Sequence, residues 1–202
     1  MRAQDTVALA ILAGGGGRRL GGADKALVRA AGRPLLAHLL DRVRPQADRI
    51  VLSANGDPAR FRAFGLPVVA DTVPDAGPLA GIAAAAAYAA AEWPAVRWLA
   101  TLPVDTPCPP ADLVARLADA AGRTGKVAAA EAGGRRHWGT ACWPLAAALG
   151  LAPAVRDKGL RRLEDAIRAA GLVGVAFGDA NAFANVNTPR DLAGLERLLT
   201  RP

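Results

Sequence analysis

The chain has 202 residues, of which 52% are hydrophobic and 21% are charged, and its formal net charge is +7 at pH 7. A chain of this length and composition buries a core of its own, which excludes an intrinsically disordered protein and a small disulfide-stabilised one. The positive charge favours anionic partners, from nucleoside triphosphates to nucleic acids.

Apolar β-type runs alternate with helical stretches along the whole chain, a pattern typical of a largely parallel sheet covered by helices. The sequence predicts an α/β fold in a single domain spanning 1–202. Strands are expected at 7–12, 49–53, 66–70, 96–102, 127–131, 137–143 and 172–177. Helices are expected at 34–43, 58–64, 77–92, 111–121 and 160–170, and from Pro189 onward with Thr188 as the N-cap.

A glycine-rich and basic segment, LAGGGGRRLGGADK at 12–25, follows the first predicted strand. Its glycines let main-chain N–H groups approach a phosphate with no Cβ in the way. Arg18, Arg19 and Lys25 add three positive charges, which suit the roughly four negative charges of a triphosphate. The segment therefore predicts a phosphate-binding loop, with a merely flexible glycine turn as the alternative.

Two better-known phosphate motifs do not match this segment. The P-loop pattern fails because Ala23 follows 17–22, with no hydroxyl partner. The dinucleotide pattern GxGxxG fails because the registers that reach a final glycine, 16–21 and 17–22, have Arg18 and Arg19 at the middle glycine.

Asp105 follows the fourth predicted strand, within LATLPVDTPCPP at 99–110. Open α/β sheets bind ligands beyond the carboxyl ends of their strands. Because Mg²⁺ takes one or two carboxylates together with phosphate oxygens, Asp105 is a candidate magnesium ligand. A turn or N-cap aspartate before the prolines is the alternative.

Two further segments are candidates for ligand contacts. Asp71 follows the third predicted strand, and helix N-terminal amides at 77–81 face an anion in one interpretation and form a loop turn in the other. In NVNTP, at 185–189, alternation puts the side chains of Asn185 and Asn187 on one side of an extended segment. They can bind a ligand or a metal-bound water, or form an Asx turn before the helix.

Other chemistries find no support. The chain has no Ser/His/Asp set, no HExxH motif and no close glutamate pair, so phosphate positioning and a metal have to supply the chemistry. Cys108 and Cys142 have neither metal nor redox spacing. Aromatic residues make up 4% of the chain, which argues against nucleic acid as a partner. Neither a signal peptide nor a run of roughly 20 apolar residues is present, so we expect a cytoplasmic protein without a membrane partner.

Four ordered motifs make the chain similar to the molybdenum cofactor guanylyltransferase (MobA) family, over 7–195. The family pattern LAGGxxRRMGGxDK is met at 12–25, with Leu20 in place of methionine. GPLAG is met at 77–81, DTP at 105–107 and NVNTP at 185–189. The chain departs from the family at Ser53, often an asparagine, and at Trp138, usually a proline.

The resemblance implies a Rossmann-like three-layer nucleotidyltransferase fold with a mostly parallel central sheet. It implies transfer of GMP from GTP to a molybdopterin-type cofactor, with release of pyrophosphate and with Mg²⁺ as the metal. The implied partners are GTP, molybdopterin or molybdenum cofactor, and other cofactor-biosynthesis proteins.

The resemblance also carries roles over to individual residues. Lys25 would hold the phosphates of the nucleotide, and Asp105 would bind Mg²⁺. For the mechanism we expect in-line displacement, in which Arg19 and Lys25 stabilise the leaving pyrophosphate. The implied binding positions are Leu12, Ala13, Gly14, Gly15, Lys25, Asn55, Asp71, Gly77, Asp105, Asn185 and Asn187. Of these, the two asparagines of NVNTP would lie on the pterin-phosphate or metal side.

Two alternatives stay open at this point. One is CMP transfer from CTP by the same fold, because base choice depends on a few loop contacts. The other is a non-catalytic nucleotide-binding protein that carries the cofactor.

Overall fold

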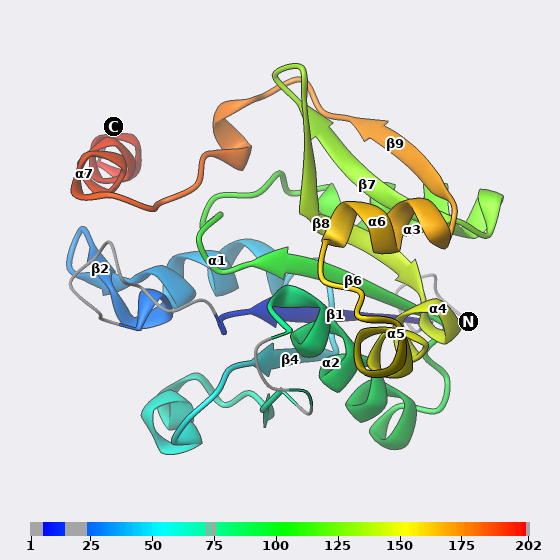
Figure 1. The fold of residues 1–202 in the computed structure, drawn as a ribbon. Coiled ribbons are helices and arrows are strands. Elements are labelled where there is room, and N and C mark those ends of the chain that lie inside the picture. Colours follow the sequence, from blue (N-terminus) through cyan, green and yellow to red (C-terminus); the bar gives the residue numbers. More distant parts are fainter. Residues whose placement is uncertain (1–5, 15–23, 72, 74–75, 201–202) are drawn as a thin grey trace.

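The computed structural model describes residues 6–14, 24–71, 73 and 76–200. Its largest sheet has seven strands in the order β5-β4-β1-β6-β8-β7-β9 (Figure 1). The strands are β1 (Val7–Leu12), β4 (Ile50–Ser53), β5 (Val68–Val69), β6 (Trp98–Pro103), β7 (Val127–Ala132), β8 (Arg135–Pro144) and β9 (Leu172–Ala176). In this sheet β8 is antiparallel to both neighbours, and the other adjacent pairs are parallel. The predicted α/β fold with a mostly parallel sheet is confirmed.

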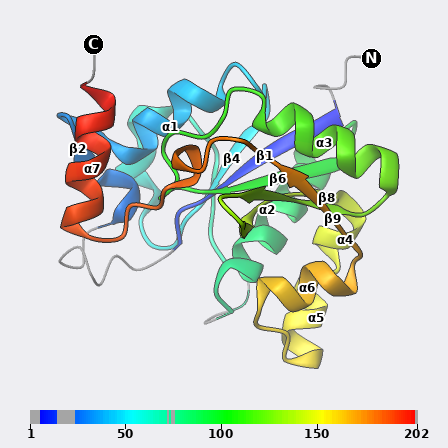
Figure 2. The same ribbon diagram turned by 90° about the horizontal axis from the view of Figure 1, so that it is seen from above.

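Helices cover both faces of this sheet (Figure 2). Helices α1 and α3 share one hydrophobic cluster with the sheet, and α2, α4, α5 and α6 share the other. The α-helices are α1 (Leu35–Val43), α2 (Pro78–Glu92), α3 (Leu113–Thr124), α4 (Leu145–Leu149), α5 (Leu151–Lys158), α6 (Leu163–Ala169) and α7 (Pro189–Leu199). The 3₁₀ helices are η3 (Lys25–Leu27), η4 (Pro58–Phe64) and η5 (Asn181–Phe183). The arrangement is the three-layer one that the resemblance implied.

Strand β1 shows how the sequence separates the two faces. Successive side chains of a strand point to opposite faces of its sheet. The large side chains of Val7, Leu9 and Ile11 pack in the cluster of α1 and α3, whereas Ala8 and Ala10 pack in the cluster of α2. Because the buried face of α2 consists mostly of alanine, this helix can lie close to the alanine side of β1.

A second, two-stranded sheet pairs β2 (Arg29–Ala30) with β3 (Arg33–Pro34). Its turn residues Ala31 and Gly32 have positive φ angles of 46° and 76°. Helix α7 lies beside this hairpin, which brings the C-terminal helix next to the segment before α1 (Figures 1 and 2). The hairpin was not predicted, since strands of two residues are too short to show an alternating pattern.

Element boundaries differ from expectation mainly between β8 and β9. Helices α4 and α5 were not predicted, and the helix expected at 160–170 is the shorter α6. It starts only after Arg162, whose backbone is extended. Strands β7 and β8 form a hairpin whose turn residues, Gly133 and Gly134, both have positive φ.

Helix α7 starts as the sequence predicted, with Thr188 as N-cap. The Thr188 hydroxyl accepts a hydrogen bond from the Asp191 N–H, at 3.2 Å. The Asp191 carboxylate in turn accepts from the N–H groups of Thr188, at 2.9 Å, and Asn187, at 3.0 Å. Because these N–H groups favour the charged carboxylate, that of Asn187 foremost, the pKa of Asp191 lies below its ordinary value.

Within the described ranges, no helix is both long and apolar enough to cross a membrane.

We predict that Asp191→Ala lowers the melting temperature at neutral pH but not in acid. The carboxylate contributes stability above the ordinary aspartate pKa of 3.8, and this contribution disappears as pH falls through the lower pKa of the folded state. The melting-temperature gap between the wild type and the variant should therefore be widest near pH 7 and close at about pH 2–3. A gap that stays constant over this range would contradict the assignment.

Candidate active site

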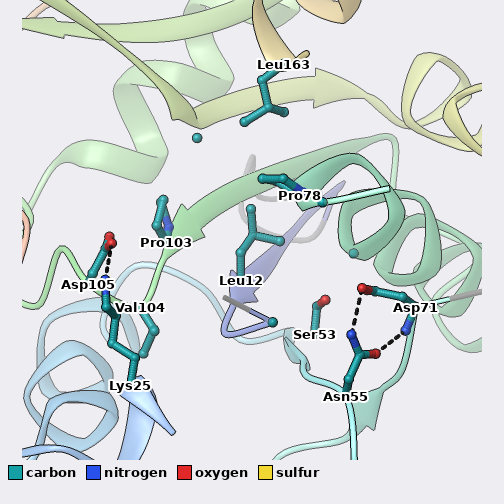
Figure 3. A pocket seen from close by; sticks show the side chains of 14 residues that line it. Leu12, Lys25, Ser53, Asn55, Asp71, Pro78, Pro103, Val104, Asp105 and Leu163 are labelled. Carbon is teal, nitrogen blue, oxygen red and sulfur yellow. Dashed lines mark hydrogen bonds and ion pairs between the residues drawn. The ribbon is translucent and has the colours of Figure 1, made fainter. Parts of the chain in front are cut away.

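A cleft of about 510 Å³ lies beyond the carboxyl ends of β1, β4, β5 and β6 (Figure 3). The sequence analysis predicted ligand-binding residues after the ends of these strands. Because parallel strands all have their carboxyl ends at the same edge of a sheet, those residues come together here. Seven of the predicted site residues line it: Leu12, Gly14, Lys25, Asn55, Asp71, Gly77 and Asp105. Two polar groups stand at opposite sides of the cleft in Figure 3, with Leu12 and Pro103 between them.

The first polar group is an ion pair between Lys25 and Asp105. Lys25 is the first residue of η3, which Asp24 caps, and Asp105 follows β6. The Lys25 Nζ donates to Asp105 Oδ2 at 3.0 Å and also to Asn187 Oδ1. The side chains of Lys25 and Asp105 are only 15% and 18% exposed, so the pair is largely shielded from solvent. The structure thus brings together three residues that the sequence assigned separately.

The second oxygen of Asp105 has no partner among the described residues. Asp105 Oδ1 is buried and accepts no hydrogen bond there. A buried carboxylate oxygen is normally satisfied, and a divalent cation is a partner that suits it. In the described ranges no group of three or more His, Cys, Asp or Glu side chains could hold a metal. Asp105 therefore fits a site in which one carboxylate is joined by phosphate oxygens and water, as Mg²⁺ prefers.

The C-terminal segment before α7 braces this side of the cleft. The Val186 N–H donates to the Asp105 carbonyl at 2.8 Å, and Thr106 Oγ1 donates to Asn185 Oδ1 at 3.1 Å. The two asparagines of NVNTP therefore have different partners: Asn187 bonds to Lys25, whereas Asn185 holds the loop after β6. Asn185 also lines a separate hollow beside α7, rather than the main cleft.

The second polar group is the pair Asn55 and Asp71, which follow β4 and β5. Asn55 Nδ2 donates to Asp71 Oδ2 at 2.8 Å, and the Asp71 N–H donates to Asn55 Oδ1 at 2.8 Å. This reciprocal pair orients both side chains at the cleft, as Figure 3 shows. A Cβ built on Gly14 would lie 3.8 Å from Asn55 and 3.9 Å from Asp71, so the start of the glycine-rich loop borders the same pair.

Two glycines in the walls of the cleft permit close packing. A Cβ on Gly81, in the first turns of α2, would collide with the Ser53 hydroxyl at the end of β4. A Cβ on Gly139 of β8 would lie 2.7 Å from Pro103 Cγ. Gly81 belongs to the GPLAG motif, but Gly139, Pro103 and Leu163 line the cleft without any chemical signal in the sequence.

Some predicted site residues do not line the cleft. Ala13 is buried behind it, and its N–H donates to the Ser53 carbonyl at 2.8 Å. Asn187 is also outside the lining and contacts the cleft through Lys25, whereas Gly77 does line it, as the N-cap of α2 with φ of 58°. Gly15 and Arg19 fall in 15–23, outside the described residues.

Three polar side chains outside the cleft, those of His137, Arg136 and Arg168, contact aromatic rings of the protein. His137 stacks on Phe183 with ring centroids 4.7 Å apart, and burial lowers the pKa of His137. The guanidinium of Arg136 lies 5.0 Å from the centroid of the Trp138 ring, and that of Arg168 lies 5.6 Å from it.

Neither cysteine is disposed to act as a nucleophile. Cys142 is fully buried, which raises its pKa to about 12. Burial also raises the pKa of Cys108, which lies outside the cleft lining. Since the reactive species is the thiolate, both thiols stay protonated and unreactive at neutral pH.

Comparison with known proteins agrees with this geometry. A molybdenum cofactor guanylyltransferase from Cereibacter sphaeroides is 47% identical over 191 residues, which is 95% of this chain and 96% of that protein. The crystal structure of molybdopterin-guanine dinucleotide biosynthesis protein A from Archaeoglobus fulgidus superposes with a TM-score of 0.76 at 20% identity. The superposition covers 95% of this chain and 98% of the Archaeoglobus fulgidus chain.

A Mycobacterium tuberculosis protein solved in complex with manganese has the same fold. Its TM-score is 0.70 at 20% identity, with 95% of this chain and 98% of that chain covered. The model of the MobA-like NTP transferase domain matches residues 9–170, which includes every strand end that forms the cleft. This chain therefore belongs to the family of MobA-like NTP transferase domains.

Proposed function

We propose that this chain transfers GMP from GTP to the phosphate of a molybdopterin-type cofactor, which yields pyrophosphate and the guanine dinucleotide form. The observation that carries this proposal is the shielded Lys25–Asp105 pair in a cleft at the strand ends. The near full-length similarity to curated guanylyltransferases supports it. A volume of about 510 Å³ falls in the range of small-ligand sites.

The reaction is an in-line displacement at the α-phosphorus of GTP. An oxygen of the acceptor phosphate forms a bond to this phosphorus, while the bond to the oxygen that bridges to the β-phosphorus breaks. The electron pair of that bond leaves with pyrophosphate. Because the acceptor phosphate is already ionised at neutral pH, the enzyme needs no nucleophilic side chain and acts by positioning and charge stabilisation.

The two sides of the cleft would hold different parts of the nucleotide. Lys25, with Arg19 assigned by motif alone, stabilises the negative charge of the leaving pyrophosphate. Asn55 and Asp71 hold the nucleoside part, bordered by the segment 12–14 and by the start of α2 at Gly77, with Gly15 assigned by motif alone. Asn187, which already bonds to Lys25, stands on the side where the acceptor phosphate arrives.

Asp105 would hold Mg²⁺ through the oxygen that lacks a protein partner. When bound, the cation neutralises charge on the α-phosphate and orients it. Cytoplasmic location and contact with other cofactor-biosynthesis proteins belong to the same proposal.

We predict that this protein uses GTP in preference to CTP. Its kcat/KM should be about a hundredfold or more higher with GTP, because a polar site that matches one base leaves its groups unpaired with another. Pyrophosphate release in the presence of Mg²⁺ and molybdopterin measures kcat/KM for each of the two nucleotides. Equal or better turnover with CTP would establish the cytidylyl alternative, and nucleotide binding with no pyrophosphate release would establish a carrier.

Asp105→Ala is expected to lower kcat by about two or more orders of magnitude, since it removes the carboxylate proposed to bind the metal. The matched control is Asp119→Ala, because Asp119 is an exposed aspartate of α3 that pairs with Arg123. Single-turnover pyrophosphate release measures both variants. Near-normal turnover of Asp105→Ala with unchanged Mg²⁺ dependence would remove Asp105 from the mechanism.

Lys25→Gln should change metal binding and nucleotide binding in opposite directions. The ammonium of Lys25 pairs with Asp105, so it competes with a divalent cation for that carboxylate. Without nucleotide, the variant should therefore bind Mn²⁺ about fivefold or more tightly than the wild type, and it should bind GTP more weakly.

Electron paramagnetic resonance of free Mn²⁺ measures the metal affinity, and calorimetry measures the GTP affinity. Lys126→Gln is the control, because Lys126 lies outside the cleft lining. Unchanged Mn²⁺ affinity in the Lys25 variant would show that the ion pair does not obstruct the metal.

A further inference from the structure

Arg60, in η4, joins two segments of the proposed nucleotide site without lining the cleft. Its Nε donates to Asp24 Oδ2 at 2.7 Å, and its Nη2 donates to the carbonyl oxygen of Asn55. Its Nη1 donates to the carbonyl oxygen of Asp57, which caps η4. The guanidinium also lies 4.4 Å from the centroid of the Phe61 ring, which is buried.

The contact with Asp24 leads to Lys25. The second carboxylate oxygen of Asp24 accepts from the Ala26 N–H at 3.1 Å and so caps η3, whose first residue is Lys25. Arg60 therefore holds the capping carboxylate from one side while the helix N-terminus holds it from the other. The side chains of Arg60 and Asp24 are 27% and 22% exposed, so water screens this pair less than a fully exposed one.

The contact with Asn55 leads to the other polar group of the cleft. Arg60 fixes the main-chain carbonyl of Asn55, while the side chain of Asn55 forms its reciprocal pair with Asp71. The next residue, Gly56, has φ of 84°, and a Cβ there would lie 3.4 Å from Arg60 Nη1. The chain after Asn55 thus turns beside the guanidinium, in a backbone conformation that a larger residue at Gly56 would adopt only with strain.

We propose that Arg60 is a positioning residue that sets the separation between the phosphate-binding side and the nucleoside-binding side of the cleft. This inference rests on the proposed function, in which one GTP molecule bridges Lys25 and the Asn55–Asp71 pair. A ligand that engages two subsites at once depends on their spacing, whereas a fragment that occupies one subsite does not. The planar fork of an arginine suits the task, because several donors point in fixed directions.

The test compares GTP with its two fragments, guanosine and pyrophosphate, on Arg60→Ala and on the wild type. Calorimetry should show GTP affinity reduced about tenfold, which corresponds to about 1.4 kcal/mol. The affinities for guanosine and for pyrophosphate should each change by less than about twofold, because each fragment stays within one side of the cleft. Arg60→Lys should lie between the two proteins, since lysine can pair with Asp24 but lacks the fork that also reaches Asn55.

Arg44→Ala is the matched control. Arg44 donates to the Phe64 carbonyl at 2.8 Å, at the other end of η4, and lies outside the cleft lining. Its removal should leave all three affinities unchanged, and circular dichroism should show that each variant is folded.

Three results would overturn the inference. Unchanged GTP affinity in Arg60→Ala would show that the spacing does not depend on this residue. An equal loss for GTP and for both fragments would indicate a general loosening of the site, and a loss for one fragment alone would assign Arg60 to that side only. A wild type that binds no GTP would instead contradict the proposed function itself.

Discussion

The ion pair between Lys25 and Asp105 depends on the order of the strands. The two residues are separated by 80 positions. Asp105 lies just beyond β6, whose last residue Pro103 is opposite Leu12 of the parallel neighbour β1, and Lys25 reaches it from η3. Withdrawing two charges from water is unfavourable unless further polar partners compensate. Lys25 has Asn187 as its second partner, whereas one oxygen of Asp105 has none among the described residues. This oxygen of Asp105 is therefore available to a ligand of positive charge, such as the divalent cation proposed above.

Small side chains shape the opposite side of the cleft, where α2 packs against the sheet. Ala8 and Ala10 of β1 face the alanine-rich α2, so this helix packs close to the sheet. The N-terminal part of α2 thereby reaches the end of β4, where Gly81 meets Ser53. The many alanines of α2 have no chemically reactive side chain, but they allow the close packing that shapes the site.

Part of the positive charge of the chain is held by contacts within the protein. Several described arginines are engaged in contacts with the protein itself. Arg60 joins Asp24 to Asn55, Arg136 contacts Glu131 and Trp138, and Arg168 contacts Glu164 and Trp138. Guanidinium groups held in this way brace loops and sheet edges. Their number thus does not by itself indicate a nucleic-acid surface, and it is compatible with a small anionic substrate.

The fold class and the edge of the sheet that carries the site follow from the amino-acid sequence alone. Buried β-type runs that end in glycine, aspartate or asparagine indicate parallel strands, and parallel strands place their carboxyl ends at one edge. For this reason the pattern places Asp71 and Asp105 at the same edge of the sheet, whereas Leu12 and Asn55 are assigned by the resemblance to the family.

Only the tertiary structure decided which of these residues touch. The Lys25–Asp105–Asn187 contacts, the different partner of Asn185 and the brace at Arg60 all join segments that are distant in sequence. The hairpin β2–β3 and the helices α4 and α5 were likewise invisible in the pattern, because short elements show too few turns of periodicity. Local patterns record which face of an element is buried, whereas contacts between loops depend on strand order and packing, which no single segment encodes.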